Sequence, residues 1–202
     1  FGEGVRSGGG QSVIYKNWEV VKECPFQTDK IYYGLDFGYA VSKTAMVEGR
    51  FNGNEVFITE KLYKNSFTTG DLLVHLPEIV QDYRHIEADS ARPESIEEIN
   101  RKKFNIHPCQ KFAGSVKAGI DTVKRYNLLI DENSLNLQKE LRYYKWIVDK
   151  NGKPTDEPLK VMDDLMDAVR YLIEGYHRLN VVSPVKTSSK MARRKPVFQD
   201  FK

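Results

Sequence analysis

Acidic side chains occur at three places where the sequence otherwise predicts apolar secondary structure: within one strand, at the end of another, and where a long helix opens. They are Asp36, Asp89 and the group Asp163, Asp164 and Asp167. An ionised carboxylate in apolar surroundings must be paired, hydrogen-bonded or bound to a metal. Asp164 and Asp167 are about one helical turn apart, so their side chains share a face. Carboxylates that converge cannot all stay ionised unless a cation holds them.

These residue types indicate one class of chemistry. If the strands that carry Asp36 and Asp89 are parallel neighbours, the chain forms an all-carboxylate site, which suits the hard ions Mg²⁺ or Mn²⁺. Two such ions roughly 3.5 to 4 Å apart can activate a water and stabilise a leaving oxygen in phosphodiester hydrolysis. The aspartates therefore predict metal-dependent phosphoryl chemistry, without naming the substrate.

Each aspartate also has a simpler structural interpretation. Asp36 can satisfy the amides of a turn before Gly38, and Asp89 can cap the segment that follows it. Asp163 and Asp164 can favour the N-terminus of a helix through its dipole. The sequence pattern is compatible both with these structural roles and with a metal site.

The elements that must position these side chains begin with a meander. Three runs, 31–39, 44–47 and 55–59, read as strands, with Asn52-Gly53-Asn54 as a tight turn. After it, helices are predicted at 68–83 (interrupted by Pro77), from Pro93, from Gly114-Ser115, after a Ser134 cap, and at 161–179; short strands are predicted at 85–89, 105–110 and 128–130. This alternation requires parallel strands beside the antiparallel ones, so we expect an α/β fold with a mixed sheet flanked by helices.

Two further segments have distinct patterns. Asn151-Gly152 is a strong hairpin signal, and Pro154 and Pro158 predict a short or irregular return strand, so a projecting, mobile hairpin is expected. Residues 13–23 are apolar enough to pack on the edge of the domain, with Trp18 as an anchor, but their structural type stays open.

Length and composition bound the possibilities. The chain has 202 residues, 31 Lys and Arg against 28 Asp and Glu, and a net charge of +3, which fits one globular domain and does not by itself indicate nucleic acid. Cys24 and Cys109 form no metal-binding pattern, which predicts reduced thiols and an intracellular setting. No run approaches the roughly 18 apolar residues of a membrane span, and we expect no membrane association.

The domain organisation follows from the same features. We expect a linker and edge segment at 1–28, one α/β domain at 29–182, and a basic flexible tail at 183–202 that orders only on a partner. The chain starts with Phe1 rather than Met, which suggests a piece of a longer polypeptide, and it contains no Walker motif.

Four blocks, in order, carry a family resemblance. They are residues 34–39 (GLDFGY), 87–93 (EADSARP), 141–144 (LRYY) and 163–171 (DDLMDAVRY). Together they resemble the C-terminal nuclease domain of the large terminase subunit of tailed double-stranded DNA bacteriophages. The resemblance runs from about residue 15 to about residue 181.

The resemblance implies a ribonuclease H-like fold and a nuclease that cuts concatemeric viral DNA during packaging. It implies that Asp36, Asp89 and Asp167 are the metal-binding aspartates, with Asp36 bridging two ions. Asp164 falls where many relatives place a His or another acid that assists, so its role in binding the second ion stays open. The hairpin near Asn151-Gly152 resembles the family's flexible element beside the active-site groove.

The resemblance also implies partners and a setting. These are double-stranded DNA, an upstream ATPase domain of the same protein, the small terminase subunit and the portal protein, in the host cell cytoplasm. Four basic residues are candidates for contacting backbone phosphates with little sequence preference, although each also fits a solvated surface: Arg92, Lys111, Lys117 and Lys124.

Two other functions compete with a nuclease. Gly34-Leu35-Asp36-Phe37-Gly38 also resembles the phosphate loop of actin-like ATPases, but that class needs a duplicated second domain and an adenosine-binding Gly segment. A non-catalytic DNA-holding or docking module, working through the basic tail, would leave the aspartates unexplained.

Overall fold

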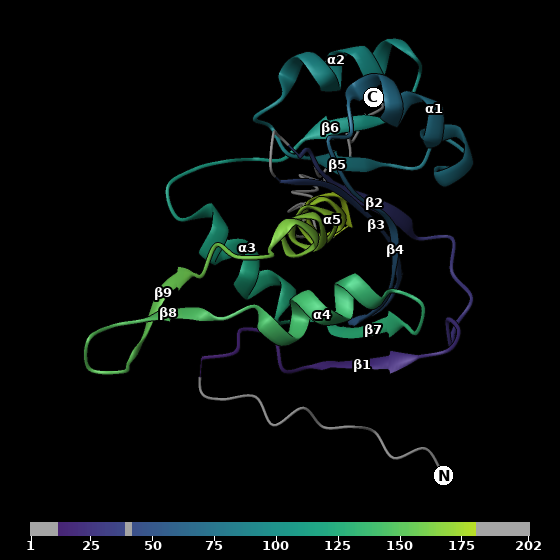
Figure 1. The fold of residues 1–202 in the computed structure, drawn as a ribbon. Helices are drawn as coiled ribbons and strands as arrows, with labels where there is room; N and C mark the ends of the chain where they lie inside the picture. The colour runs from purple at the N-terminus through teal and green to yellow at the C-terminus, as the bar shows by residue number, and fades with distance from the viewer. Residues whose placement is uncertain (1–11, 39–41, 181–202) are drawn as a thin grey trace, which may run out of the picture.

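The structure, a computed structural model, describes residues 12–38 and 42–180. The predicted linker at 1–11 and the predicted basic tail at 183–202 therefore lie outside the described residues. The described part forms a seven-stranded sheet with helices on both faces, and a separate two-stranded hairpin (Figure 1). The α/β class and the mixed sheet that the sequence predicts are confirmed.

The sheet has the order β1-β7-β4-β3-β2-β5-β6. Its strands are β1 (Trp18–Val21), β2 (Ile31–Asp36), β3 (Lys43–Asn52), β4 (Glu55–Asn65), β5 (Ile86–Ala88), β6 (Ile106–Pro108) and β7 (Asn127–Asp131). Strands β2, β3 and β4 are antiparallel, as the predicted meander requires, and Gly53 makes the turn between β3 and β4 with φ +60°. Parallel pairing extends the sheet on both sides, through β5 and β6 next to β2 and through β7 and β1 next to β4.

In the part of the chain that the structure describes, five helices cover the two faces of the sheet. They are α1 (Thr69–Ile79), α2 (Pro93–Arg101), α3 (Ser115–Val123), α4 (Leu135–Tyr143) and α5 (Asp164–Asn180). Apolar residues of α1 and α2 pack with β2, β5 and β6 in one core cluster, while α3, α4 and α5 pack with β3, β4 and β7 in another. Figure 1 shows the sheet curving around α5, which lies inside the curve with α1 and α2 on the opposite side of the sheet.

Close packing between β2 and α5 depends on a glycine. A Cβ placed on Gly34 would lie 2.8 Å from the Leu172 Cβ and closer still to the Ala168 carbonyl oxygen. Because a side chain at this position would push the helix away, Gly34 lets α5 lie directly on β2, two residues before Asp36. The spacing of the two elements therefore sets how near Asp36 comes to the acidic start of α5.

Three predicted helix boundaries or caps are wrong. Helix α1 ends at Ile79, because Val80 has an extended backbone with φ −104° and ψ 116°; Tyr83, inside the predicted helix, has φ +52° and is exposed. Helix α5 starts at Asp164 rather than at 161, because Met162 has φ +53°; the Met162 side chain is exposed, although the apolar spacing 162, 165, 166, 169 predicts that it is buried. The Ser134 side chain makes no cap bond in α4; its Oγ accepts the Glu60 N–H at 2.8 Å instead.

The hairpin and the edge segment have defined places in the fold. Strands β8 (Trp146–Val148) and β9 (Pro154–Pro158) pair antiparallel around Gly152, which has φ +75°, and Figure 1 shows the hairpin projecting from the body. Its projection is confirmed, whereas its mobility stays a prediction. Strand β1 pairs with β7 at the sheet's edge, so the edge segment is a strand. Within the described residues, no helix has both the length and the apolar character needed to cross a membrane.

Candidate functional site

The site forms where two parallel strands end side by side. Strand β2 pairs with β5 in parallel, with Leu35 opposite Ala88, and the Asp89 N–H donates to the Leu35 carbonyl oxygen at 3.0 Å. Asp36 ends β2 and Asp89 directly follows β5. The carboxyl ends of the two strands therefore place Asp36 and Asp89 at the same edge of the sheet, which was the condition for a shared site.

Helix α5 adds the other two carboxylates. Asp164 is its first residue and Asp167 follows one turn later, and the helix lies on β2 through Gly34. Burial, followed by the charges of the other three aspartates, raises the pKa of Asp36 from 3.8 to about 9. The structure thus brings together four residues, here called the site aspartates: Asp36, Asp89, Asp164 and Asp167.

Electrostatic repulsion extends along the start of α5. Burial raises the pKa values of Asp163 and Asp164, and the charge of Asp167 adds to both shifts. For Asp164, the backbone N–H of Lys43 acts in the opposite direction. Several carboxyl groups here are therefore harder to ionise than usual, which is the signature of acids that lack a sufficient positive partner.

Two cationic side chains hold part of this negative charge. Asp89 Oδ1 forms an ion pair with Lys111 Nζ and accepts the Ala91 N–H at 3.0 Å. Asp167 Oδ1 accepts from Arg170 Nη2 at 2.8 Å. Among the described residues, no three His, Cys, Asp or Glu side chains are arranged to hold a metal ion as they stand. Asp89 and Asp167 thus each face a basic side chain in this structure.

The donor set nonetheless fits a hard divalent cation. The site aspartates supply oxygen atoms from three places in the fold, and burial, followed by the charges of the other three aspartates, raises the pKa of Asp36. Oxygen-only ligands are typical of Mg²⁺ and Mn²⁺ sites. For Asp89 Oδ1 to bind such an ion, it must give up its contact with Lys111 Nζ.

Sequence reasoning missed one residue that positions the site. Glu140 of α4 is fully buried, and its Oε2 accepts the backbone N–H groups of Leu165 and Met166 at 2.9 and 3.2 Å, while Oε1 accepts the Tyr63 hydroxyl at 2.6 Å. It therefore caps the first turn of α5 from another helix. Burial raises its pKa to about 7, although the Tyr63 bond opposes the shift. An acid that caps a helix distant in sequence leaves no local pattern to find.

Replacing Glu140 with alanine is expected to loosen the first turn of α5. Because two buried N–H groups lose their acceptor, Glu140→Ala should lower the free energy of unfolding by about 2 kcal/mol. Glu140→Gln retains an amide oxygen that can accept both N–H groups, so it should stay within about 1 kcal/mol of the native protein. Thermal unfolding of both variants checks this, and equal behaviour of the two would contradict the capping role.

The four predicted DNA contacts separate into two groups. Lys111 contacts Asp89, and Arg92 lines a cavity of about 530 Å³ together with Phe37 and Gly38, directly beyond Asp36. Lys117 and Lys124 instead lie on or at the end of α3. Their Nζ atoms lie 2.5 Å from Asp156 Oδ2 and 3.5 Å from Asp121 Oδ1, respectively. The structure therefore places Lys111 on a site aspartate. Arg92 lines the cavity beyond Asp36, but its Nε pairs with Glu94 Oε1 at 2.6 Å, and Lys117 and Lys124 also pair with acids outside the site.

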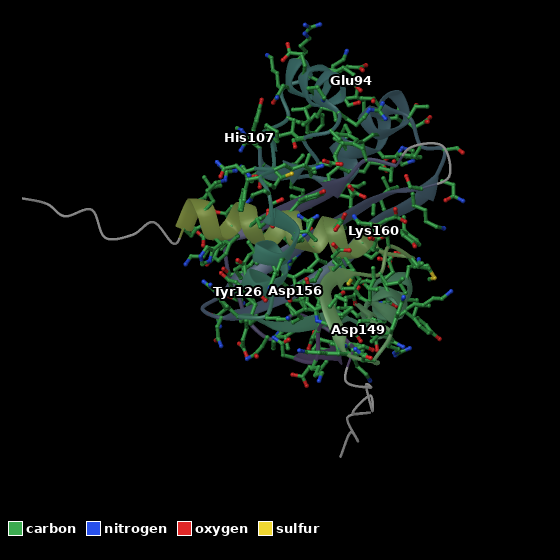
Figure 2. All side chains as sticks on the ribbon, turned by 90° about the vertical axis from the view of Figure 1, so that its left-hand side faces the viewer. Glu94, His107, Tyr126, Asp149, Asp156 and Lys160 are labelled. Carbon is green, nitrogen blue, oxygen red and sulfur yellow. The ribbon has the colours of Figure 1, made fainter. Side chains whose placement is uncertain are left out.

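Lys160 marks where the chain approaches the start of α5 from the hairpin. Figure 2 shows Lys160, shortly before α5, between Glu94 of α2 above it and Asp149 of the hairpin turn below it. The charge of Lys160 opposes the raised pKa of Asp163. Helix α2 and the hairpin therefore lie on either side of the start of α5.

Comparisons with known proteins agree on one family. A family profile described as "Terminase RNAseH like domain" matches residues 36–175. The PBSX phage terminase large subunit of Bacillus subtilis (strain 168) is 27% identical over 161 residues, which cover 77% of this chain but 37% of that protein. The chain thus spans little more than a third of that relative.

Solved structures show the same fold. The nuclease domain of the g2p large terminase from bacteriophage SPP1, solved with bound Mn, superposes with a TM-score of 0.71 at 23% identity, covering 81% of this chain and 98% of that one. The large terminase nuclease from thermophilic phage G20c, solved with bound magnesium, gives 0.58 at 16% identity, covering 77% and 85%. The ribonuclease H-like fold that the sequence blocks imply is confirmed.

Proposed function

The chain belongs to the terminase RNase H-like domain family, and on that basis we propose that it is a divalent-metal-dependent endonuclease that cuts concatemeric viral DNA during packaging. The observation that carries the proposal is the convergence of the site aspartates, from two strand ends and one helix start, on one place where the pKa of Asp36 is raised to about 9. Acids so placed are costly without a cation, and their oxygens suit Mg²⁺ or Mn²⁺.

In this proposal each aspartate has a separate task. Two ions would be held by Asp36, shared by both, and by Asp89 and Asp167, one for each ion, and Asp164 would assist. When bound, two such ions supply an activated water and stabilise the leaving oxygen of a phosphodiester. Gly34 and Glu140 fix α5 against β2, which keeps the carboxylates of the helix and of the strands within reach of each other.

The substrate and partners of the whole protein are part of the proposal. Lys111, which pairs with Asp89, and Arg92, which lines the cavity beyond Asp36, contact backbone phosphates in this proposal. Such contacts carry no sequence information, which suits cutting with little sequence preference. The hairpin beside the start of α5 controls access of DNA. An upstream ATPase domain, the small terminase subunit and the portal protein complete the packaging machine in the host cell cytoplasm.

A plasmid assay tests the proposed activity. Supercoiled plasmid incubated with the 202-residue chain and millimolar Mn²⁺ or Mg²⁺ should become nicked and then linear, and a chelator should stop the reaction. Products with ends spread over many sequences would support cutting with little specificity. Retarded plasmid without any cutting, at every metal concentration, would instead favour a non-catalytic DNA-holding module.

A further inference from the structure

Lys111 forms an ion pair with Asp89, whose carboxylate the proposed function assigns to a metal ion. Lys111 Nζ forms an ion pair with Asp89 Oδ1, and the side chain of Asp89 is 15% exposed. Lys111 itself is 46% exposed, so its ammonium lies at the boundary between the site and solvent. A positive charge there partly replaces the cation that the site aspartates require.

The segment that carries Lys111 is fixed at both ends. The Cys109 N–H donates to the Ala88 carbonyl oxygen at 2.7 Å, which holds the end of β6 beside β5. The Ser115 N–H donates to the Phe112 carbonyl oxygen at 2.9 Å where α3 begins. The backbone near Lys111 is thus held next to Asp89, whereas its long side chain has a solvent-exposed path away from the carboxylate.

We propose that Lys111 exchanges partners at the active site: its ammonium neutralises Asp89 in the metal-free protein, gives up that carboxylate to a divalent ion, and then contacts a DNA phosphate. This inference rests on the proposed function. Lysine suits the exchange because its ammonium is a compact charge on a flexible stem. The ion pair between Lys111 and Asp89 therefore lowers the affinity of the free protein for metal. When metal binds, the released Lys111 ammonium becomes available to contact a phosphate.

Metal binding without DNA tests the first half of the exchange. Lys111→Met removes the competing ammonium and keeps the aliphatic stem, so the variant should bind Mn²⁺ roughly two- to fivefold more tightly, as expected for loss of one partly exposed ion pair. Lys117→Met is the matched control, because Lys117 is also 46% exposed and paired with an aspartate, Asp156, outside the site. Its Mn²⁺ affinity should equal that of the native protein, measured by the electron paramagnetic resonance signal of free Mn²⁺.

DNA binding in a chelator tests the second half without any cutting. Asp89→Asn frees Lys111, so it should tighten binding of a labelled duplex, measured by fluorescence anisotropy. The increase in duplex affinity caused by Asp89→Asn should be at least about threefold smaller in the Lys111→Met background, because the freed ammonium is then missing. Equal gains in both backgrounds would overturn the contact with phosphate.

The outcomes also separate this inference from the proposed function. If the native protein binds Mn²⁺ and Asp36→Asn does not, the metal site stands. An unchanged or weaker Mn²⁺ affinity in Lys111→Met would then overturn the exchange alone. If the native protein and Asp36→Asn bind Mn²⁺ equally poorly, the proposed metal site itself fails.

Discussion

Replacing Asp36 with asparagine is expected to reduce DNA cleavage by at least about a thousandfold while making the metal-free protein more stable. The loss of activity follows because Asp36 lies among the other site aspartates and is proposed to hold both ions, and a thousandfold corresponds to about 4 kcal/mol of transition-state stabilisation. The gain in stability follows because the same carboxyl group is costly to ionise when no cation is present.

The direction of the pH dependence follows from the pKa of Asp36. Its value in the folded protein, about 9, is raised above the ordinary value of 3.8, so the group opposes folding wherever the unfolded chain would ionise it. Asp36→Asn should therefore raise the free energy of unfolding by about 1–3 kcal/mol at pH 7. The difference should shrink as the pH falls toward 3.8, and it should vanish only well below that value, where Asp36 is protonated in both states.

Thermal unfolding in a chelator at pH 7 and pH 4.5, with a parallel plasmid assay, measures both effects. Asp156→Asn is a suitable control, since Asp156 is 75% exposed on β9 and pairs with Lys117 outside the site. That variant should cut and unfold like the native protein. An Asp36→Asn variant that still cuts, or that is less stable than the native protein at pH 7, would contradict the account.

Replacing Arg170 with methionine should have the largest effect on stability. Arg170 is 4% exposed, lies 2.8 Å from Asp167 Oδ1 and 3.5 Å from Glu174 Oε1, and its pKa is raised by Asp167 even though burial opposes the shift. Removing the guanidinium leaves two carboxyl groups near each other without their cation. The expected loss is about 3–5 kcal/mol in the free energy of unfolding, as for other buried ion pairs that lose one partner.

Chemical denaturation of Arg170→Met beside Arg101→Met measures this loss. Arg101 forms a helical ion pair with Glu97 on the surface of α2, and the two side chains are 76% and 61% exposed. Its replacement should change stability by less than about 0.5 kcal/mol. Similar small effects at both positions would show that Arg170 is not the counter-charge that stabilises the start of α5.

The sequence was sufficient for the elements and for the candidate aspartates, because both depend on local patterns. Apolar periodicity located the meander and α5, and a carboxylate at the end of an apolar run marked Asp36 and Asp89. Whether Asp36 and Asp89 lie side by side could not be predicted from local patterns, because it depends on parallel pairing of β2 with β5, which is present in the structure. The ends of α1 and α5 were predicted less well, since positive φ angles at Tyr83 and Met162 override the helical pattern.

The remaining features of the site depend on contacts between distant segments. Glu140 caps α5 across 25 positions of sequence, and Lys111 reaches Asp89 from the loop after β6. Neither contact has a periodic or spacing signal, because each arises only when the sheet and helices have assembled. The candidate DNA-binding lysines show a second limit of the sequence. Lys111, Lys117 and Lys124 could not be distinguished from their sequence context, but Lys117 and Lys124 pair with acids outside the site.

Anomalous scattering from a crystal soaked in Mn²⁺ tests the central claim most directly. We expect peaks between Asp36, Asp89 and Asp167, with Lys111 displaced from Asp89, and two peaks at roughly 3.5 to 4 Å would support hydrolysis by two ions. The absence of a peak at millimolar Mn²⁺, with Asp89 still paired to Lys111 and Asp167 still paired to Arg170, would contradict a metal-dependent nuclease.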